Sequence, residues 1–434
     1  MPISRRNLIQ LLPATAAALS LPGRSAAQTV HHVVVIGGGF AGCTAAKYLK
    51  LWGGDRVAVT LVESRARHVS CVMSNLVLNE QLKVSDLAFY YDKLASNYGV
   101  TVVRDRARRI NGPDKLIKLR DAGWVPYDSL VVATGIKFES IPGLDTRLVP
   151  HAWIAGGQTN RLRNQIRTMP DNGTFVMTIP KAPYRCPPGP YERACLVADI
   201  LGRRSGALGG SASPANTPKV VVLDANPQIM AERETFSRAF DGLYGNIIEY
   251  RSDVEVDSVD SEARTVFTTS GQSFAGDVLN VIPRHRAGQL VYRSGLTGGD
   301  DSRWAPVDPV TYESTLPDFP GVHIIGDSQG TGQPKSGHMA NAQAKVCADA
   351  ILRRSMGLPT HGAERLANIT TNSACFSPIT HSRASWLTAV YRYNPGTGLM
   401  ELAPGSLGEA HEWNSENYED MFSWSRNLFA DTFA

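Results

Sequence analysis

One cysteine leads a proline-rich run in the middle of this 434-residue chain. Cys186 is followed by the residues Pro-Pro-Gly-Pro-Tyr-Glu-Arg, and the apolar stretch 175–179 comes just before it. A sulfur atom held in a stiff loop suits thiol–disulfide exchange, in which a small soft nucleophile attacks one sulfur of a disulfide. The segment therefore predicts oxidation of a small substrate through sulfur chemistry, with Cys186 as one of the reacting groups.

The same loop stands where a flavoenzyme with two dinucleotide sites needs its second glycine-rich turn. Residues 173–180 predict a strand, 192–201 a helix, and 219–223 a second strand that ends at Asp224. This is a βαβ unit with its acidic residue, but it lacks the glycines that let a pyrophosphate approach a helix N-terminus. We therefore expect no nicotinamide cofactor to bind here.

An intact dinucleotide fingerprint lies near the start of the chain. A predicted buried strand precedes Gly37, Gly39 and Gly42, which have the spacing of a phosphate-binding turn. A second predicted strand, 57–62, ends at Glu63, about twenty residues beyond the glycines, where a carboxylate can bind the hydroxyls of an adenosine ribose. This part of the chain is therefore expected to bind one dinucleotide.

Two later segments favour FAD over NAD. A strand and turn that end in Thr134 and Gly135 resemble a segment of FAD-dependent disulfide reductases. A late strand that ends in Asp327 resembles the one whose aspartate binds the ribityl chain in those enzymes. Lys335, just before a predicted helix, can place positive charge beside the flavin, although a solvated lysine is the alternative. FAD is the expected cofactor.

These segments predict an α/β chain with an FAD domain interrupted by an insertion. The expected fold has two Rossmann-like domains of the FAD/NAD-linked reductase type and a C-terminal α+β interface domain. The predicted limits are 30–150 with 275–356 for the FAD domain, 151–274 for the second Rossmann-like domain, and 357–434 for the interface domain. Aromatic residues in the last part indicate a core or a subunit interface, or alternatively a docking face for a redox partner.

The first 27 residues have the layout of an export signal. Arg5 and Arg6 precede an apolar stretch at 11–21, and small residues follow at 25–27. An arginine pair, a short apolar region and a small-residue cleavage site are typical of twin-arginine export. A short membrane anchor or a chance basic start is the alternative. The mature protein is therefore expected in the periplasm.

Composition gives little information about partners. The chain is 43% hydrophobic and 19% charged, with a net charge of +4, which indicates neither a nucleic-acid partner nor membrane insertion. Six cysteines are too few for a disulfide scaffold of this size, and Cys43, Cys195 and Cys347 are expected to be buried free thiols. The histidines show no metal-ligand spacing and no haem-attachment motif is present, so any haem belongs to another chain.

Several motifs together resemble the flavoprotein subunit of flavocytochrome c sulfide dehydrogenase. The most specific is the run Cys-Pro-Pro-Gly-Pro-Tyr-Glu-Arg that begins at Cys186. The resemblance extends over essentially the whole mature chain. The segments that carry it are the glycine fingerprint at 37–42 and residues 68–75, 184–193, 304–308, 334–337 and 372–377.

The resemblance implies specific roles for three cysteines. It implies a thioether between Cys71 and the flavin, and a redox-active disulfide between Cys186 and Cys375 that oxidises sulfide to sulfur or polysulfide. It also implies that a c-type cytochrome subunit, which carries haem c and forms a heterodimer with this chain, accepts the electrons. An ordinary stabilising disulfide and, for Cys71, an inert buried thiol are the alternatives.

Three functions compete at this point. The first is sulfide oxidation with a cytochrome c acceptor. The second is a sulfide:quinone oxidoreductase, which shares the fold and the cysteines but needs a C-terminus seated in the membrane. The third is a periplasmic redox partner that keeps a sulfur-carrier protein active. The export signal and the acidic residues between 409 and 420 count against the second, because anionic lipid repels acidic segments.

Overall fold

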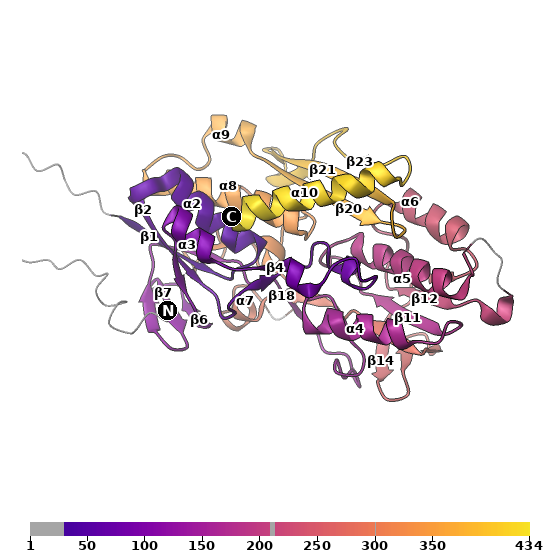
Figure 1. The fold of residues 1–434 in the computed structure, drawn as a ribbon. Helices are drawn as coiled ribbons and strands as arrows, with labels where there is room; N and C mark the ends of the chain where they lie inside the picture. Colours follow the sequence, from indigo (N-terminus) through magenta and orange to yellow (C-terminus); the bar gives the residue numbers. More distant parts are fainter. Residues whose placement is uncertain (1–29, 209–212, 300) are drawn as a thin grey trace, which may run out of the picture.

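The computed structural model describes residues 30–208, 213–299 and 301–434 (Figure 1). The proposed export signal at 1–27 lies outside the described residues. The first layer is a five-stranded parallel sheet in the order β19-β9-β1-β2-β5. Its strands are β1 (His31–Ile36), β2 (Val57–Val62), β5 (Thr101–Val103), β9 (Ser129–Val132) and β19 (Val322–Ile324).

This sheet is assembled from segments almost 200 residues apart in the chain, because β19 joins it after the inserted part. Apolar runs such as Val33, Val34 and Val35, each 0% exposed, form its strands, as expected for a parallel sheet covered on both faces. Helices α2 (Phe40–Gly53) and α8 (Gly337–Ser355) pack together on one side, next to α3 (Asp92–Tyr98). Two small antiparallel sheets flank the main sheet: β3 (His68–Val69) with β4 (Ala88–Phe89), and β6 (Ala107–Asn111) with β7 (Leu116–Leu119) and β8 (Gly123–Pro126).

The inserted part has its own four-stranded parallel sheet in the order β13-β12-β11-β17. Its strands are β11 (Thr174–Ile179), β12 (Lys219–Asp224), β13 (Ile248–Arg251) and β17 (Val278–Val281). Helices α4 (Gly157–Thr168), α5 (Gly189–Ser205) and α6 (Arg233–Arg238) belong to this part, as does an antiparallel sheet of β14 (Val256–Asp260), β15 (Thr265–Thr268) and β16 (Ser273–Ala275). The chain passes from the first sheet to the inserted part after β10 (Ile136–Phe138) and returns through β18 (His285–Ala287). These two strands pair with each other in antiparallel fashion, and α7 (Gln289–Arg293) follows.

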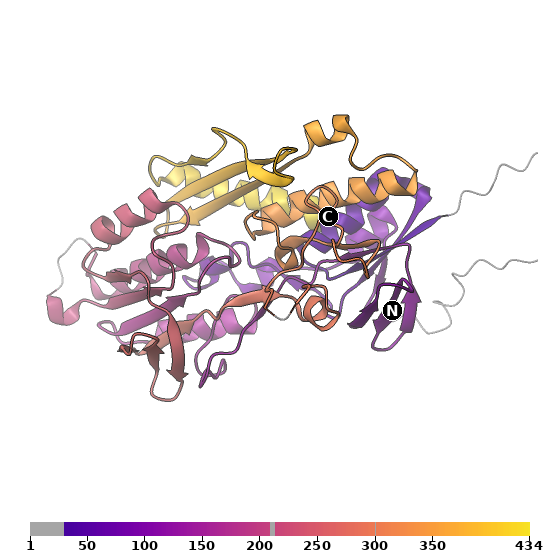
Figure 2. The same cartoon turned by 180° about the vertical axis from the view of Figure 1, so that it is seen from behind.

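The C-terminal part is an antiparallel sheet with one long helix. Strands β20 (Thr370–Pro378) and β21 (Ala384–Asn394) form a long hairpin, which β22 (Leu399–Leu402) and β23 (Gly408–Glu409) extend. Helix α10 (Ser415–Phe433) then crosses the molecule from beside β23 and α6 to α2 (Figures 1 and 2). The short α9 (Ala363–Asn368) contacts β21, and its Arg365 donates to Asp349 of α8. The expected fold class is confirmed, and the exact domain limits stay predictions.

Candidate functional site

The glycine turn after β1 is packed so closely that side chains have no room. Gly37 has a φ of +107°, and a Cβ added there would lie 2.5 Å from the Ala133 carbonyl oxygen. A Cβ on Gly42 would lie 1.8 Å from the Gly37 oxygen, which fixes α2 against the strand. At Gly39 the nearest atom would be the His68 ring at 3.6 Å, so this glycine leaves space for a ligand.

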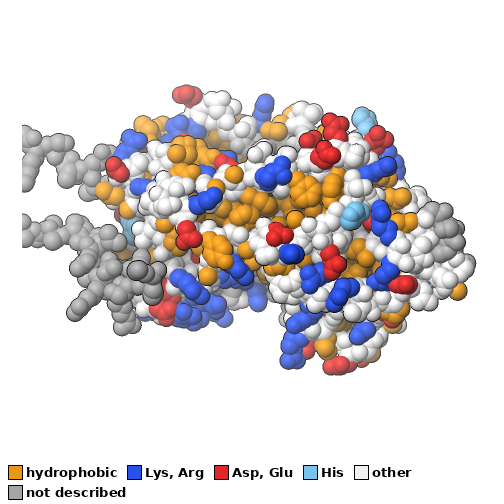
Figure 3. Space-filling view, viewed as in Figure 1, with side chains coloured by type: hydrophobic (Ala, Val, Ile, Leu, Met, Phe, Trp, Pro, Cys, Tyr) orange, Lys and Arg blue, Asp and Glu red, His pale blue; other side chains and the backbone are white. Residues whose placement is uncertain are grey.

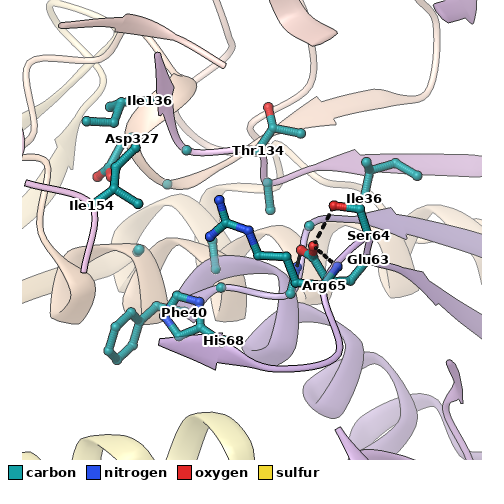
Figure 4. A pocket seen from close by; sticks show the side chains of 18 of the residues that line it. Ile36, Phe40, Glu63, Ser64, Arg65, His68, Thr134, Ile136, Ile154 and Asp327 are labelled. Atoms are coloured by element: carbon teal, nitrogen blue, oxygen red, sulfur yellow. Dashed lines mark hydrogen bonds between the residues drawn. The ribbon is translucent and has the colours of Figure 1, made fainter. Parts of the chain in front are cut away.

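Backbone N–H groups orient the carboxylate of Glu63, which directly follows β2. Its Oε2 accepts a hydrogen bond from the Gly38 N–H at 2.8 Å, and its Oε1 accepts from the Arg65 N–H at 2.9 Å (Figure 4). The Ser64 hydroxyl donates to the same Oε1 at 3.1 Å. These bonds orient the carboxylate beside the glycine turn, where a ribose would lie.

A cavity of about 320 Å³ extends from this turn toward the inserted part. Seven of the predicted cofactor residues line it: Gly37, Gly39, Glu63, Cys71, Thr134, Gly135 and Asp327. Gly42 lies beneath the turn, outside the lining. The N-terminus of α8 also reaches the cavity, through Ser336 and Gly337. An open glycine turn, an oriented carboxylate and a helix N-terminus are features that fit FAD, with the pyrophosphate at the turn.

The structure does not place Lys335 in the lining of this cavity. Its side chain is buried, and Nζ donates to the Gln329 carbonyl at 2.6 Å and lies 3.8 Å from the centre of the Trp304 ring. Burial lowers the pKa of Lys335 to about 7, an effect that the charge of Asp327 opposes. Arg185, which the sequence did not single out, lines the cavity instead, and its Nε lies 2.6 Å from Asp327 Oδ2.

A second, smaller cavity of about 60 Å³ adjoins the first. The two share Cys71, Arg185, Ser336 and Gly337. Cys186 and Cys375 both line the smaller one, so it receives thiols from three separate segments; we call it the thiol pocket. All six cysteines are described and all are free, so the structure does not show the Cys186–Cys375 disulfide, which stays a prediction.

Burial is the main influence on these thiols. It raises the pKa of Cys186 well above the ordinary value, and the charge of Cys375 adds to this effect. Burial likewise raises the pKa of Cys375 to about 12, with a contribution from Glu232. The pKa of Cys71 is raised by burial, which Arg185 opposes. When the pair is reduced, both thiols are therefore expected to be protonated near neutral pH.

The Cys186 loop is pinned from both sides. Its N–H donates to the Lys335 carbonyl at 2.7 Å, and its carbonyl accepts from the Gly189 N–H at 3.0 Å. Cys186 itself has a φ of +56°, a conformation that non-glycine residues rarely adopt. A Cβ on Gly189 would lie 2.9 Å from Cys186 Sγ, so this glycine makes room for the sulfur. The loop thus holds one thiol at a fixed position.

Two charged residues of α5 complete the thiol pocket, and the sequence did not assign them a role. Glu192 is 8% exposed and Arg193 only 1%. Asn75 joins them: its Nδ2 donates to Glu192 Oε1 at 3.0 Å, and its Oδ1 accepts from Arg193 Nε at 3.0 Å. Burial raises the pKa of Glu192 to about 8 and lowers that of Arg193 to about 9. A charged pair directly before the uncharged run 194–198 of a helix is the signal that could have identified them.

In the inserted sheet, the carboxylate that would bind a second nucleotide is Asp224, and other protein side chains occupy its hydrogen-bonding positions. Asp224, at the end of β12, is 0% exposed. Its Oδ2 accepts hydrogen bonds from the hydroxyls of Tyr191 at 2.8 Å and Tyr250 at 2.9 Å. Its Oδ1 accepts from Asn226. Because this carboxylate is satisfied internally, the arrangement supports the expectation that no nicotinamide cofactor binds here.

Comparisons with known proteins agree with this arrangement. Residues 159–283 match the family model "Sulfide dehydrogenase [flavocytochrome c] flavoprotein chain, central", and residues 31–167 match the pyridine nucleotide-disulphide oxidoreductase model. The flavoprotein chain of sulfide dehydrogenase from Chlorobaculum thiosulfatiphilum is 49% identical over 45 residues, which are 10% of this chain and 92% of that sequence. The chain belongs to the flavocytochrome c sulfide dehydrogenase flavoprotein family.

More distant relatives of this flavoprotein extend over nearly all of it. The mitochondrial sulfide:quinone oxidoreductase of Dictyostelium discoideum is 20% identical over 415 residues, which are 91% of this chain and 83% of that protein. The structure of the sulfide:quinone oxidoreductase from Aquifex aeolicus matches with a TM-score of 0.72 at 16% identity, over 93% of this chain and 92% of that one. The structure of the NAD-dependent persulfide reductase from A. fulgidus matches with a TM-score of 0.57 at 17% identity, over 92% and 77%. The flavoprotein thus has the fold of FAD-dependent disulfide oxidoreductases and belongs among FAD-dependent sulfide oxidoreductases.

Proposed function

We propose that this flavoprotein is the catalytic subunit of a periplasmic sulfide dehydrogenase that passes electrons to a c-type cytochrome subunit. The observation that carries the proposal is the position of three thiols where the two cavities meet. Cys71 lines both cavities, and Cys186 and Cys375 line the thiol pocket beside it. The periplasmic location rests on the sequence of residues 1–27 alone, and secretion of a reporter fused to that segment tests it.

In the proposed reaction the Cys186–Cys375 disulfide is the electrophile. Hydrosulfide attacks one sulfur, a new S–S bond forms to the substrate, and the bond between the two cysteines breaks to leave a thiolate. When bound, FAD supplies a two-electron acceptor that can release the electrons singly. Net oxidation of one hydrosulfide gives one sulfur atom, one proton and two electrons. The rigid Cys186 loop and the strand that carries Cys375 hold the two sulfurs for these steps.

Glu192 is the group that we propose exchanges the proton in the thiol pocket. It lines the pocket, and burial raises its pKa to about 8. A carboxyl group with a pKa near the working pH both accepts and donates protons efficiently. The Asn75 amide orients it, and the nearby Arg193 charge opposes part of the burial effect. An ionised Glu192 takes the proton from the substrate sulfur as the persulfide forms.

We propose that FAD is joined by a thioether to Cys71. This cysteine lies at the junction of the two cavities, on a short loop that Ser70 anchors. The Ser70 N–H donates to the Leu87 carbonyl at 2.8 Å, and its hydroxyl donates to the Val72 carbonyl at 3.1 Å. A fixed thiol at the edge of the flavin cavity is what a covalent attachment requires.

An apolar face beside the cavities is the proposed docking site for the cytochrome subunit. Four aromatic residues of α10 are half-buried: Tyr418, Phe422, Trp424 and Phe429. Trp424 also lines the thiol pocket, so the face lies next to the thiols. In Figure 3, hydrophobic side chains form a band across the middle of the molecule, in the region where Figure 1 shows α10. Aromatic residues at a surface next to a redox site suit a partner that accepts electrons.

A quinone acceptor is the second candidate, because sulfide:quinone oxidoreductases match this chain over nearly its full length. No helix in the described part of the chain is long and apolar enough to cross a membrane. The identity of the electron acceptor distinguishes the two candidate functions. Purified, FAD-loaded protein with sulfide is mixed under anaerobic conditions with either a c-type cytochrome or a water-soluble quinone analogue. We expect rapid reduction of the cytochrome only; fast reduction of the quinone alone would overturn the cytochrome assignment.

A further inference from the structure

Arg193 is a buried cation in the wall of the thiol pocket, and it lacks an ionic partner. Its side chain lines the pocket and the residue is only 1% exposed. No carboxylate in the described part of the chain lies within ion-pair distance of it, although other arginines nearby, such as Arg185 and Arg203, have such partners. Burying a charge without a counter-ion is costly, so the position calls for a functional explanation.

Neutral acceptors hold the Arg193 guanidinium but leave one of its donors over. Nε donates to Asn75 Oδ1 at 3.0 Å, and Nη2 donates to the Ala152 carbonyl at 2.8 Å. Nη1 donates to the His151 carbonyl at 3.1 Å and to Asn280 Oδ1 at 2.9 Å. A guanidinium has five N–H donors, so the second N–H of Nη2 has no partner among the described residues. The arginine is thus fixed in place and keeps both its charge and one donor for an anion.

The guanidinium lies on the side of the pocket that contains Cys186. Its central carbon is 4.6 Å from the centre of the Trp153 ring. A Cβ added to Gly189 would lie 3.0 Å from Trp153 Cη2 and 2.9 Å from Cys186 Sγ, so the indole edge and the sulfur are neighbours. The charge of Cys186 also raises the pKa of Arg193, in opposition to burial. The cation therefore lies close to one of the two sulfurs of the proposed reaction.

The other titratable side chains that line the pocket, the cysteines apart, do not neutralise Arg193. Arg185 is already paired with Asp327, at 2.6 Å. Burial lowers the pKa of His338, which leaves its ring uncharged near neutral pH. Burial also raises the pKa of Glu192 to about 8 and lowers that of Arg193 to about 9. Near neutral pH the arginine is therefore charged and most of the glutamate is not, which gives the pocket a positive charge.

We propose that Arg193 forms a subsite for a small monovalent anion beside Cys186, and that its ligand during turnover is hydrosulfide. The choice of hydrosulfide rests on the proposed function. Hydrosulfide carries one negative charge, and the second N–H of Nη2 donates to its sulfur. The pocket volume of about 60 Å³ has room for roughly four to six water-sized groups, so a bulky thiolate such as glutathione does not fit there.

Hydrosulfide as the ligand is tested by the sulfide concentration that half-saturates the rate of anaerobic flavin bleaching. Arg193→Gln should raise this concentration roughly tenfold or more, the loss expected for a hydrogen bond to a charged group. The limiting rate at saturating sulfide should change far less, and Arg193→Lys, which keeps the charge, should restore part of the affinity. The control is Arg203→Gln, an exposed residue of the same helix, which should behave as wild type. An unchanged half-saturating concentration in Arg193→Gln would show that hydrosulfide does not bind there.

The anion subsite itself is tested without sulfide. Protein reduced with a phosphine is labelled at one pH with iodoacetate, an anion, or with iodoacetamide, its neutral analogue, and modification of Cys186 is measured by peptide mass spectrometry. The ratio of the two rates cancels any change in the pKa of Cys186, because both reagents react with the same thiolate. Arg193→Gln should lower the ratio of iodoacetate to iodoacetamide labelling severalfold. An equal ratio in the variant and in wild type would overturn the subsite.

The outcomes separate this inference from the function on which part of it rests. If sulfide does not bleach the flavin of wild-type protein, the proposed function and hydrosulfide as the ligand both fail, and the labelling ratio still decides the anion subsite. If wild type is bleached but the labelling ratio does not depend on Arg193, the subsite alone is wrong. Should Arg193→Gln fail to fold, the wild-type ratio at Cys186 is compared with that of free cysteine. A higher ratio supports the subsite, and an equal or lower one contradicts it.

Discussion

At the level of single residues, the six thiols of this flavoprotein lie in two kinds of environment. Cys43, Cys195 and Cys347 are 0% exposed and lie in helices, as the sequence indicates. Cys71, Cys186 and Cys375 are partly exposed and line cavities. The contrast between inert core thiols and thiols at a cavity supports the assignment of redox roles to the second group.

At Cys71 the covalent link is open to a direct test. Acid precipitation of wild-type protein should leave the yellow flavin in the pellet, because a thioether survives denaturation. Cys71→Ser should release the flavin to the supernatant, since serine does not form that bond. Cys347→Ala, a change at a buried thiol outside both cavities, serves as the control and should retain the colour. A colourless wild-type pellet contradicts the thioether.

The raised pKa of Glu192 makes the folding stability of the protein depend on pH. Its pKa of about 8 lies above that of an unfolded glutamate, so between about pH 4.5 and 8 the folded state keeps a proton that the unfolded state has lost. This contribution favours folding at low pH and is lost as pH rises through that window. Glu192→Gln should therefore gain stability relative to wild type by about 1.4 kcal/mol per pH unit across this window. Denaturant unfolding at pH 5 and pH 8 measures this, and an equal difference at both pH values contradicts the raised pKa.

At the scale of elements, the proline loop and α5 replace a nucleotide-binding turn. The sequence predicts a helix at 192–201, whereas α5 begins at Gly189 and ends at Ser205. The early start is possible because Pro190 lies in the first turn, where a missing N–H costs no hydrogen bond. Tyr191 then donates to Asp224, so this carboxylate is not free to bind a ribose.

This replacement predicts the response to reduced nicotinamides. NADH should bleach the flavin at a negligible rate under anaerobic conditions, while sulfide bleaches it rapidly. The physical reason is that Asp224 is buried and already accepts hydrogen bonds from Tyr191 and Tyr250. Stopped-flow absorbance with equal concentrations of NADH and sulfide decides the matter. Rapid bleaching by NADH would show that the loop admits a nucleotide after all.

The sequence predicts some of these elements well and others not at all. The turn at Gly37 and the carboxylate of Glu63 lie within one βαβ unit, so local spacing places them correctly. The Asn75 amide reaches Glu192 from 117 residues away, and such a contact depends on how the parts pack. Lys335 illustrates the same limit, because the sequence places it correctly before α8 but gives no sign that its side chain turns toward Trp304.

At the scale of the whole molecule, three parts meet at the thiol pocket. The loop after β3 provides Cys71, the inserted part provides Cys186, and the C-terminal sheet provides Cys375. Helix α10 spans these parts on one face, and Lys47 of α2 donates to the carbonyls of Ala430 and Ala434 at its end (Figure 1). The thiol pocket therefore depends on how all three parts pack together.

The apolar face of α10 predicts a specific effect on electron transfer. Phe422→Ser should weaken binding of the cytochrome subunit and slow cytochrome reduction severalfold, because it removes aromatic contact area from the centre of the face. Bleaching of the flavin by sulfide should stay unchanged. Arg426→Ser, an exposed change on the same helix, is the control. Equal rates of cytochrome reduction by both variants would show that the cytochrome does not dock on this face of α10.

The redox disulfide is tested most directly by sulfide-dependent cytochrome c reduction with folded, FAD-loaded Cys186→Ser and Cys375→Ser variants. If the two cysteines form the redox disulfide, each variant should lose turnover almost completely while flavin content stays at the wild-type level, and Cys195→Ala should retain activity. A merely structural bridge would cost roughly 2–5 kcal/mol of stability and leave the folded protein active. Near-normal rates in either cysteine variant would show that sulfide oxidation does not depend on a Cys186–Cys375 disulfide.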